Sequence, residues 1–165
     1  MSRISSIPEL YAHAIAIERE AAERYAELAV RMSDESKDDL AALFAGLAAQ
    51  EVGHLEALER RTAGMDLPPL ASGDYKWIGD AAPESAAREL VFRLMTPRRA
   101  LVMALGAEQR AQAFFEHVLV TAGDPALRAL AREMAADEQE HVQLIERMLE
   151  NTADDVVHWE DLYPG

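Results

Sequence analysis

Two copies of a Glu-x-x-His pattern constrain the fold of this chain most strongly. On a helix, residues three positions apart lie on the same face, so each copy aims one carboxylate and one imidazole at a common point. Each copy follows a stretch that carries one glutamate among apolar positions. The complete set is Glu18, Glu51, His54, Glu108, Glu138 and His141. In helix bundles, four glutamates and two histidines in this arrangement hold two iron or manganese ions.

The apolar pattern predicts four helices. Apolar residues recur at three- and four-residue steps, which is the period of an amphipathic helix. Pro8 opens the first stretch, and residues 33–36 interrupt it and supply caps for the second. Thr96-Pro97 and Asp124-Pro125 are start signals for the other two. The predicted helices span about residues 8–32, 36–61, 97–121 and 125–150.

The candidate ligands fall at one depth in two hairpins. Glu18 and Glu51 each lie roughly 21–23 Å from the turn between their helices, at about 1.5 Å per residue. Glu108 and Glu138 lie at matching depths from the second turn. The predicted fold class is therefore all-α, an antiparallel four-helix bundle made of two helix hairpins. A long crossover over residues 63–96 must join the hairpins.

Length and composition narrow the remaining possibilities. A chain of 165 residues, 50% of them hydrophobic, suits a single domain over residues 1–165, with a tail over 151–165. The absence of Cys excludes disulfides, thiolate nucleophiles and Cys-ligated iron or zinc within this chain. The net charge of −14 argues against a nucleic-acid partner. Because the chain has neither a membrane-length apolar run nor a signal-peptide core, we expect a cytoplasmic protein without a membrane partner.

Considered alone, each candidate ligand has a simpler interpretation. An isolated Glu on a helix is usually solvated, and His54 or His141 could pack in the core as an ordinary histidine. Together, four carboxylates and two imidazoles buried without a cation would carry a prohibitive desolvation penalty. Carboxylate and imidazole ligands suit iron and manganese. We therefore interpret the set as a metal site.

In order and spacing, these residues resemble the rubrerythrin branch of the ferritin-like superfamily over roughly residues 8–150. That branch carries Glu, Glu-x-x-His, Glu and Glu-x-x-His on four helices, with a Tyr seven residues after the first Glu, here Tyr25. The resemblance implies a ferritin-like bundle with a non-haem di-iron site. It implies that Glu51 and Glu138 bridge the ions, and that Glu18 and Glu108 bind one ion each. Tyr25 either bonds to a ligand carboxylate or packs in the core.

The chain also departs from full rubrerythrins. It has no Cys for the rubredoxin module that feeds electrons to the site, so the resemblance implies an external electron donor. Ala111 stands where an additional Glu ligand is typical, and Phe115 where a second Tyr is expected. The six-ligand set is equally similar to the ferroxidase centre of bacterioferritins, but Val52 replaces their haem-ligating Met. We expect a homodimer or small homo-oligomer and not a storage cage.

These patterns predict an oxidoreductase that reduces peroxide or O₂ at a site of two Fe ions, for which Mn is also suited. Two alternatives stay open. One is a ferroxidase or iron-handling protein whose substrate is Fe²⁺, and the other is a non-catalytic helical module with a structural metal site. A di-iron oxygenase acting on an organic substrate is less favoured, because no sequence feature specifies such a substrate.

Two polar residues are expected to hold the free ring nitrogens of the histidines. Asp137 and Gln50 each directly precede a Glu of the bridging type, which in a pseudo-twofold bundle places each beside the opposite helix. A metal-bound His usually donates its other N–H to an acceptor. We therefore expect Asp137 to bond to His54 and Gln50 to bond to His141.

Overall fold

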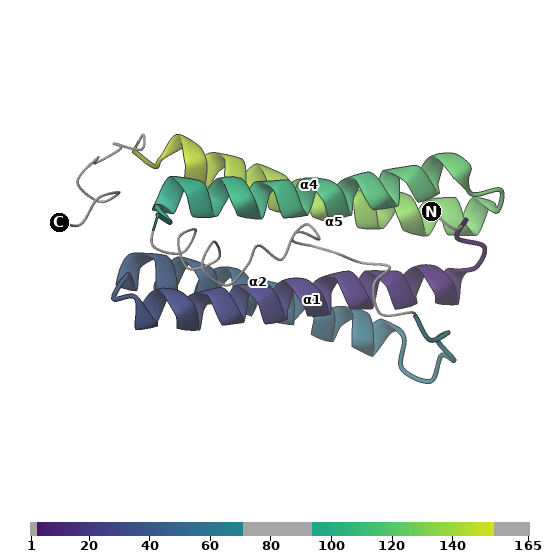
Figure 1. Cartoon of the computed structure of the whole chain (residues 1–165). Helices are drawn as coiled ribbons and strands as arrows, with labels where there is room; N and C mark the ends of the chain where they lie inside the picture. Colours follow the sequence, from purple (N-terminus) through teal and green to yellow (C-terminus); the bar gives the residue numbers. More distant parts are fainter. Residues whose placement is uncertain (1–2, 71–93, 154–165) are drawn as a thin grey trace.

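The computed structural model describes residues 3–70 and 94–153, which form four α-helices (Figure 1). Their bounds are α1 Ile7–Asp34, α2 Asp38–Arg61, α4 Pro97–Thr121 and α5 Pro125–Glu150. α4 and α5 have the predicted bounds. Most of the predicted crossover and tail lies outside the described residues. None of the helices in the described ranges combines the length and apolar character needed to cross a membrane.

Three of these helices begin at a side-chain cap. Ser6, Thr96 and Asp124 each accept a hydrogen bond from a backbone N–H in the first turn of α1, α4 and α5. Each of the three helices also has a Pro in its first turn. Backbone N–H groups in the first turn have no partner within the helix, so the N–H that Pro lacks costs no helical hydrogen bond. These caps set where α4 and α5 begin, and therefore the depth at which their candidate ligands lie.

The turn between α1 and α2 differs from the predicted one. α1 continues to Asp34 and α2 begins only at Asp38, so the stretch expected to cap α2 ends α1 instead. Ser36 has a φ of 58°, a left-handed conformation that stops a helix. Lys37, the residue before α2, makes no side-chain cap bond. The sequence signal was ambiguous because short polar side chains favour both helix starts and turns.

The helices form two antiparallel hairpins, α1–α2 and α4–α5, that pack into one bundle (Figure 1). Most backbone contacts lie within the hairpins, between α1 and α2 and between α4 and α5, whereas those between hairpins mainly join α1 to α5 and α2 to α4. The turn of the first hairpin meets the start of α4, because Lys37 Nζ donates to the backbone oxygen of Met95 at 3.1 Å. At the other end, Ile4 packs in a cluster with Ala122 and Leu127. This arrangement confirms the predicted fold class.

Two apolar clusters fill the bundle, one toward each end. The first includes Tyr25, Phe44 and Leu101, and the second includes Leu10 and Phe115. On α1, α4 and α5, the candidate ligands lie in the interval between the two clusters. The bundle therefore holds a polar layer between two apolar ones, and burial of both clusters keeps that layer near the middle of the helices.

Candidate metal centre

The candidate ligands extend from four helices into the polar layer. α1 contributes Glu18, α2 Glu51 and His54, α4 Glu108, and α5 Glu138 and His141. All except His54 are buried, with at most 7% of each residue exposed, and His54 is half-buried. Charged side chains are almost never fully buried unless they are paired or bind a metal. Four buried carboxylates at one level therefore need a compensating positive charge.

His141 lies at the centre of the layer. Its Nδ1 is 3.3 Å from Oε2 of Glu108, 3.4 Å from Oε2 of Glu138 and 3.7 Å from Oε1 of Glu51. Its ring also stacks on the ring of His54, with centroids 4.3 Å apart and an interplanar angle of 25°. Side chains from α2, α4 and α5 therefore converge on one imidazole.

The potential ligand atoms form two groups that share His141. The groups are Glu51, His54 and His141, and Glu108, Glu138 and His141. Within each group all the atoms lie within 4.8 Å of one another, so small side-chain rotations would bring them onto one ion. Glu18 belongs to neither group, although it is buried in the same layer and hydrogen-bonds with Glu51. The structure thus brings five of the six predicted residues into ligand groups and leaves Glu18 beside them.

In the absence of metal, the polar layer retains protons. Burial, a hydrogen bond with Glu18 and the charge of Glu108 raise the pKa of Glu51 to about 11. Burial, offset in part by the hydrogen bond to His141, raises the pKa of Glu138 to about 8. Burial alone would lower the pKa of His141, but its hydrogen bonds to Glu108 and Glu138 raise this pKa to about 11. All three shifts reduce the negative charge in the layer, which is also what a bound cation would do.

The donor set fits iron or manganese. Carboxylate oxygens and imidazole nitrogens are the ligands that these metals take in proteins, and none of the six side chains is a soft sulfur donor. A divalent or trivalent ion would displace the protons and offset the repulsion among the carboxylates. The layer is therefore a candidate metal site on its chemistry as well as its geometry.

Tyr25 orients one of the carboxylates. Its hydroxyl is fully buried and donates a hydrogen bond to Oε1 of Glu108 at 3.0 Å. Burial and the charges of Glu108 and Glu51 raise the pKa of Tyr25, so that the hydroxyl keeps its proton. Because Oε1 of Glu108 is engaged by Tyr25, Oε2 is left facing His141. The structure contains both roles expected for Tyr25, because the hydroxyl bonds to Glu108 while the ring packs in the first apolar cluster.

Replacing Tyr25 by Phe should weaken metal binding by roughly 10–100-fold, as is usual when a group that holds a ligand is removed. The reason is that Glu108 would lose the hydrogen bond that fixes its orientation. Competition with a chelator measures the effect. Tyr11→Phe is the matched control, because Tyr11 interacts with Arg61. Equal affinities in wild type and Tyr25→Phe would contradict the role assigned to the hydroxyl.

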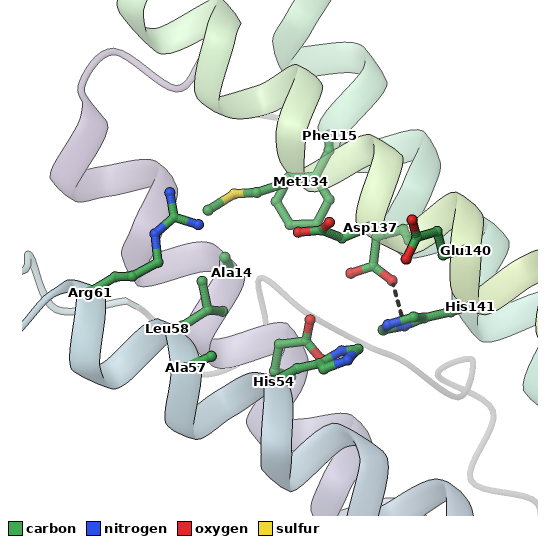
Figure 2. Close-up of a pocket in the computed structure, with 12 residues that line it drawn as sticks. Ala14, His54, Ala57, Leu58, Arg61, Phe115, Met134, Asp137, Glu140 and His141 are labelled. Carbon is green, nitrogen blue, oxygen red and sulfur yellow. Dashed lines mark ion pairs between the residues drawn. The ribbon is translucent and has the colours of Figure 1, made fainter.

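A cavity of about 270 Å³ adjoins this layer, and we call it the histidine cavity (Figure 2). Its polar lining consists of Glu18, His54, Asp137, Glu138, Glu140 and His141. Its apolar lining consists of Ala14, Ala57, Leu58, Phe115 and Met134. Arg61 lies at the end away from the two histidines (Figure 2). None of residues 52–61 of α2 is fully buried, and four of them, His54, Ala57, Leu58 and Arg61, line the cavity.

The predicted crossed hydrogen bonds are only partly tested. Within the described part of the chain, Nε2 of His141 is buried without a hydrogen-bond partner, so the expected bond from Gln50 is wrong. Asp137 lines the histidine cavity together with His54, and their hydrogen bond stays a prediction. Sequence reasoning did not find the stack, since no spacing rule relates histidines on different hairpins.

Comparison with known proteins agrees with this geometry. The rubrerythrin family model matches residues 9–86. The chain is 32% identical to an uncharacterized conserved protein of known structure from Magnetospirillum magnetotacticum MS-1, with a TM-score of 0.76 over 93% of this chain and 99% of the other. None of the curated proteins matches the chain. The chain therefore belongs to the rubrerythrin-like group of the ferritin-like di-iron superfamily.

Proposed function

We propose that this chain binds two iron ions and reduces peroxide with electrons from an external donor. The observation that carries the proposal is the pair of Glu/His groups that meet at His141, all buried except the half-buried His54, in a chain of this family. The proposed ligands are Glu18, Glu51, His54, Glu108, Glu138 and His141. Manganese suits the same donors, and the family favours iron.

When bound, a pair of iron ions supplies two electrons for reducing an O–O bond. The chain supplies the ligands and their orientation. Glu51 and Glu138 are proposed as bridges, because each lies on a helix that also provides a His. Glu18 and Glu108 are proposed to bind one ion each, with Tyr25 fixing Glu108 through its hydroxyl. The apolar clusters cover the layer toward both ends of the bundle.

Electrons must come from outside the chain. The sequence contains no Cys, so it holds neither a thiol pair nor an iron–sulfur cluster that could return the site to its reduced state. A separate redox partner is therefore part of the proposal. The assembly as a homodimer or small homo-oligomer, and the cytoplasmic location, stay predictions from the sequence.

The proposal is tested by mixing the reduced, iron-loaded chain with one equivalent of hydrogen peroxide or of O₂ in a stopped-flow instrument. Oxidation by peroxide should be faster by about tenfold or more, a difference of about 1.4 kcal/mol in activation free energy. Glu51→Ala, which should lack the dinuclear site, is the negative control. Slow reaction with peroxide, together with repeated turnover of excess Fe²⁺ to a ferric mineral, would identify a ferroxidase instead. Bound iron that reacts with neither oxidant would indicate a structural site.

A further inference from the structure

We propose that the histidine cavity binds small, uncharged alkyl hydroperoxides, which makes them substrates of this site in addition to hydrogen peroxide. The inference rests on the proposed function and names a substrate class for it. It is carried by three properties of the cavity, namely its size, the division of its lining into a polar and an apolar part, and its charge.

The cavity is larger than hydrogen peroxide requires. It measures about 270 Å³, whereas a single water needs only about 10–15 Å³ and an apolar cavity of about 150 Å³ accommodates benzene. A cavity that served only peroxide or O₂ would need a small part of this volume. The remaining space is sufficient for a short alkyl or a single aryl group.

The lining is polar where the reaction would occur and includes apolar side chains further away, before Arg61 at the far end (Figure 2). His54 and His141 lie at one end, and Leu58 and Met134 lie toward Arg61 at the other (Figure 2). A hydroperoxide is itself divided in this way, with a polar –OOH group and an apolar body. Its –OOH group would lie at the proposed ligands while its carbon atoms contact Leu58 and Met134. Ligand sites commonly combine apolar walls with a few polar groups in this manner.

The charges around the cavity disfavour an anionic substrate. Asp137 and Glu140 line it beside the proposed ligands. The guanidinium of Arg61 is engaged on two sides, by both carboxylate oxygens of Glu133 and by the ring of Tyr11. It therefore has little capacity to bind a substrate carboxylate. Since the cavity has acidic groups and a neutralised cation, an uncharged hydroperoxide fits it better than a fatty-acid hydroperoxide.

The reduction of an alkyl hydroperoxide balances with electrons from the external donor already proposed. The O–O bond of R–O–O–H breaks, and with two electrons and two protons the products are the alcohol R–OH and water. The electrons come from the external reductant through the metal site, and the protons come from solvent. The alcohol leaves by the same cavity.

The binding step is measured without turnover, with 2-phenylpropan-2-ol, the alcohol formed from cumene hydroperoxide. Ligand-observed saturation-transfer NMR on the full chain should show transfer to the phenyl and methyl protons. Ala57→Leu and Ala57→Phe add side-chain volume to the cavity wall at a half-buried position, and should weaken this binding in that order, by about tenfold or more for Phe. Ala129→Phe, at an exposed position of α5, is the control and should bind as wild type does.

Turnover gives the second readout. The ratio of kcat/KM for cumene hydroperoxide to that for hydrogen peroxide should fall by about tenfold or more in Ala57→Phe and stay unchanged in Ala129→Phe. Circular dichroism shows whether each variant retains its helices, and Ala57→Leu provides the comparison if the Phe variant does not fold.

The outcomes separate this inference from the proposed function. Absence of alcohol binding to a wild-type chain that holds iron and reacts with hydrogen peroxide would overturn the cavity proposal alone. Equal binding by wild type and both Ala57 variants would do the same. A chain that fails to bind iron would overturn the proposed function, whatever the alcohol does.

Discussion

Glu51→Ala and Glu138→Ala should each abolish the dinuclear site, with iron falling from two ions per chain to one or none. Each residue belongs to one of the two ligand groups that meet at His141, and each is at most 3% exposed. If each carboxylate bridges the ions as proposed, its loss would remove a ligand from both, so the loss in affinity should exceed the roughly 10–100-fold effect of removing a supporting residue. Metal analysis after reconstitution and desalting measures the result.

The matched controls are Glu56→Ala on α2 and Glu146→Ala on α5, both at exposed positions of the same helices. They should retain two ions. A melting curve of each metal-free variant separates lost ligation from lost folding. Glu51→Gln is the gentlest variant for this purpose, because it keeps the side-chain shape while it removes a carboxyl group that is costly to ionise in the folded state. Equal metal loss in the ligand and control variants would show that the assignment of helix faces is wrong.

In the metal-free chain, the free energy of unfolding should fall as the pH rises from about 5 to 9. Glu51 and Glu138 have pKa values of about 11 and about 8 in the metal-free fold, against an ordinary value of 4.5. The folded chain therefore binds these protons more tightly than the unfolded chain. The stability they contribute is fully present below pH 4.5 and is lost as the pH rises through 8 and toward 11. His141 acts in the same direction, since its pKa is raised from 6.5 to about 11.

Bound metal should reverse this loss, because ions take the place of the protons and bind the deprotonated ligands more tightly at higher pH. At a free metal concentration a thousand times Kd, each ion stabilises the fold by about 4 kcal/mol, or roughly 8–16 °C in Tm for a chain of this size. Thermal unfolding with and without Mn²⁺, which avoids oxidation by air, should show a gap in Tm that widens from pH 5.5 to 8.5.

Glu51→Gln should flatten the pH dependence of the metal-free chain, whereas Glu56→Gln should leave it unchanged. The first replaces a buried carboxyl and the second an exposed one. A metal-free wild type whose Tm is constant or rises over this pH range would contradict the protonated polar layer described above.

Much of the fold and the candidate site could be predicted because the signals are local. Thr96-Pro97 and Asp124-Pro125 mark helix starts through hydrogen bonds within one turn, and the structure has both caps. The Glu-x-x-His spacing sets a helix face, and depth along two hairpins then follows from helix geometry. These local rules place most of the candidate ligands in one layer before any tertiary contact is known.

The features that could not be predicted depend on contacts between hairpins, or on backbone conformations that several residue types can adopt. The stack of His54 on His141 depends on how the hairpins meet. The histidine cavity is lined by side chains from all four helices, so it too depends on contacts between hairpins and has no local sequence signature. The left-handed Ser36 was missed because a short polar residue suits a turn as well as a cap.

Iron content and Mössbauer spectra of the full chain, reconstituted with isotopically enriched iron, test the central claim most directly. The proposed site predicts two iron ions per chain, magnetically coupled to each other in the oxidised protein, with the coupling lost in Glu51→Ala. A folded wild-type chain that binds no iron, or a single uncoupled ion, would contradict it.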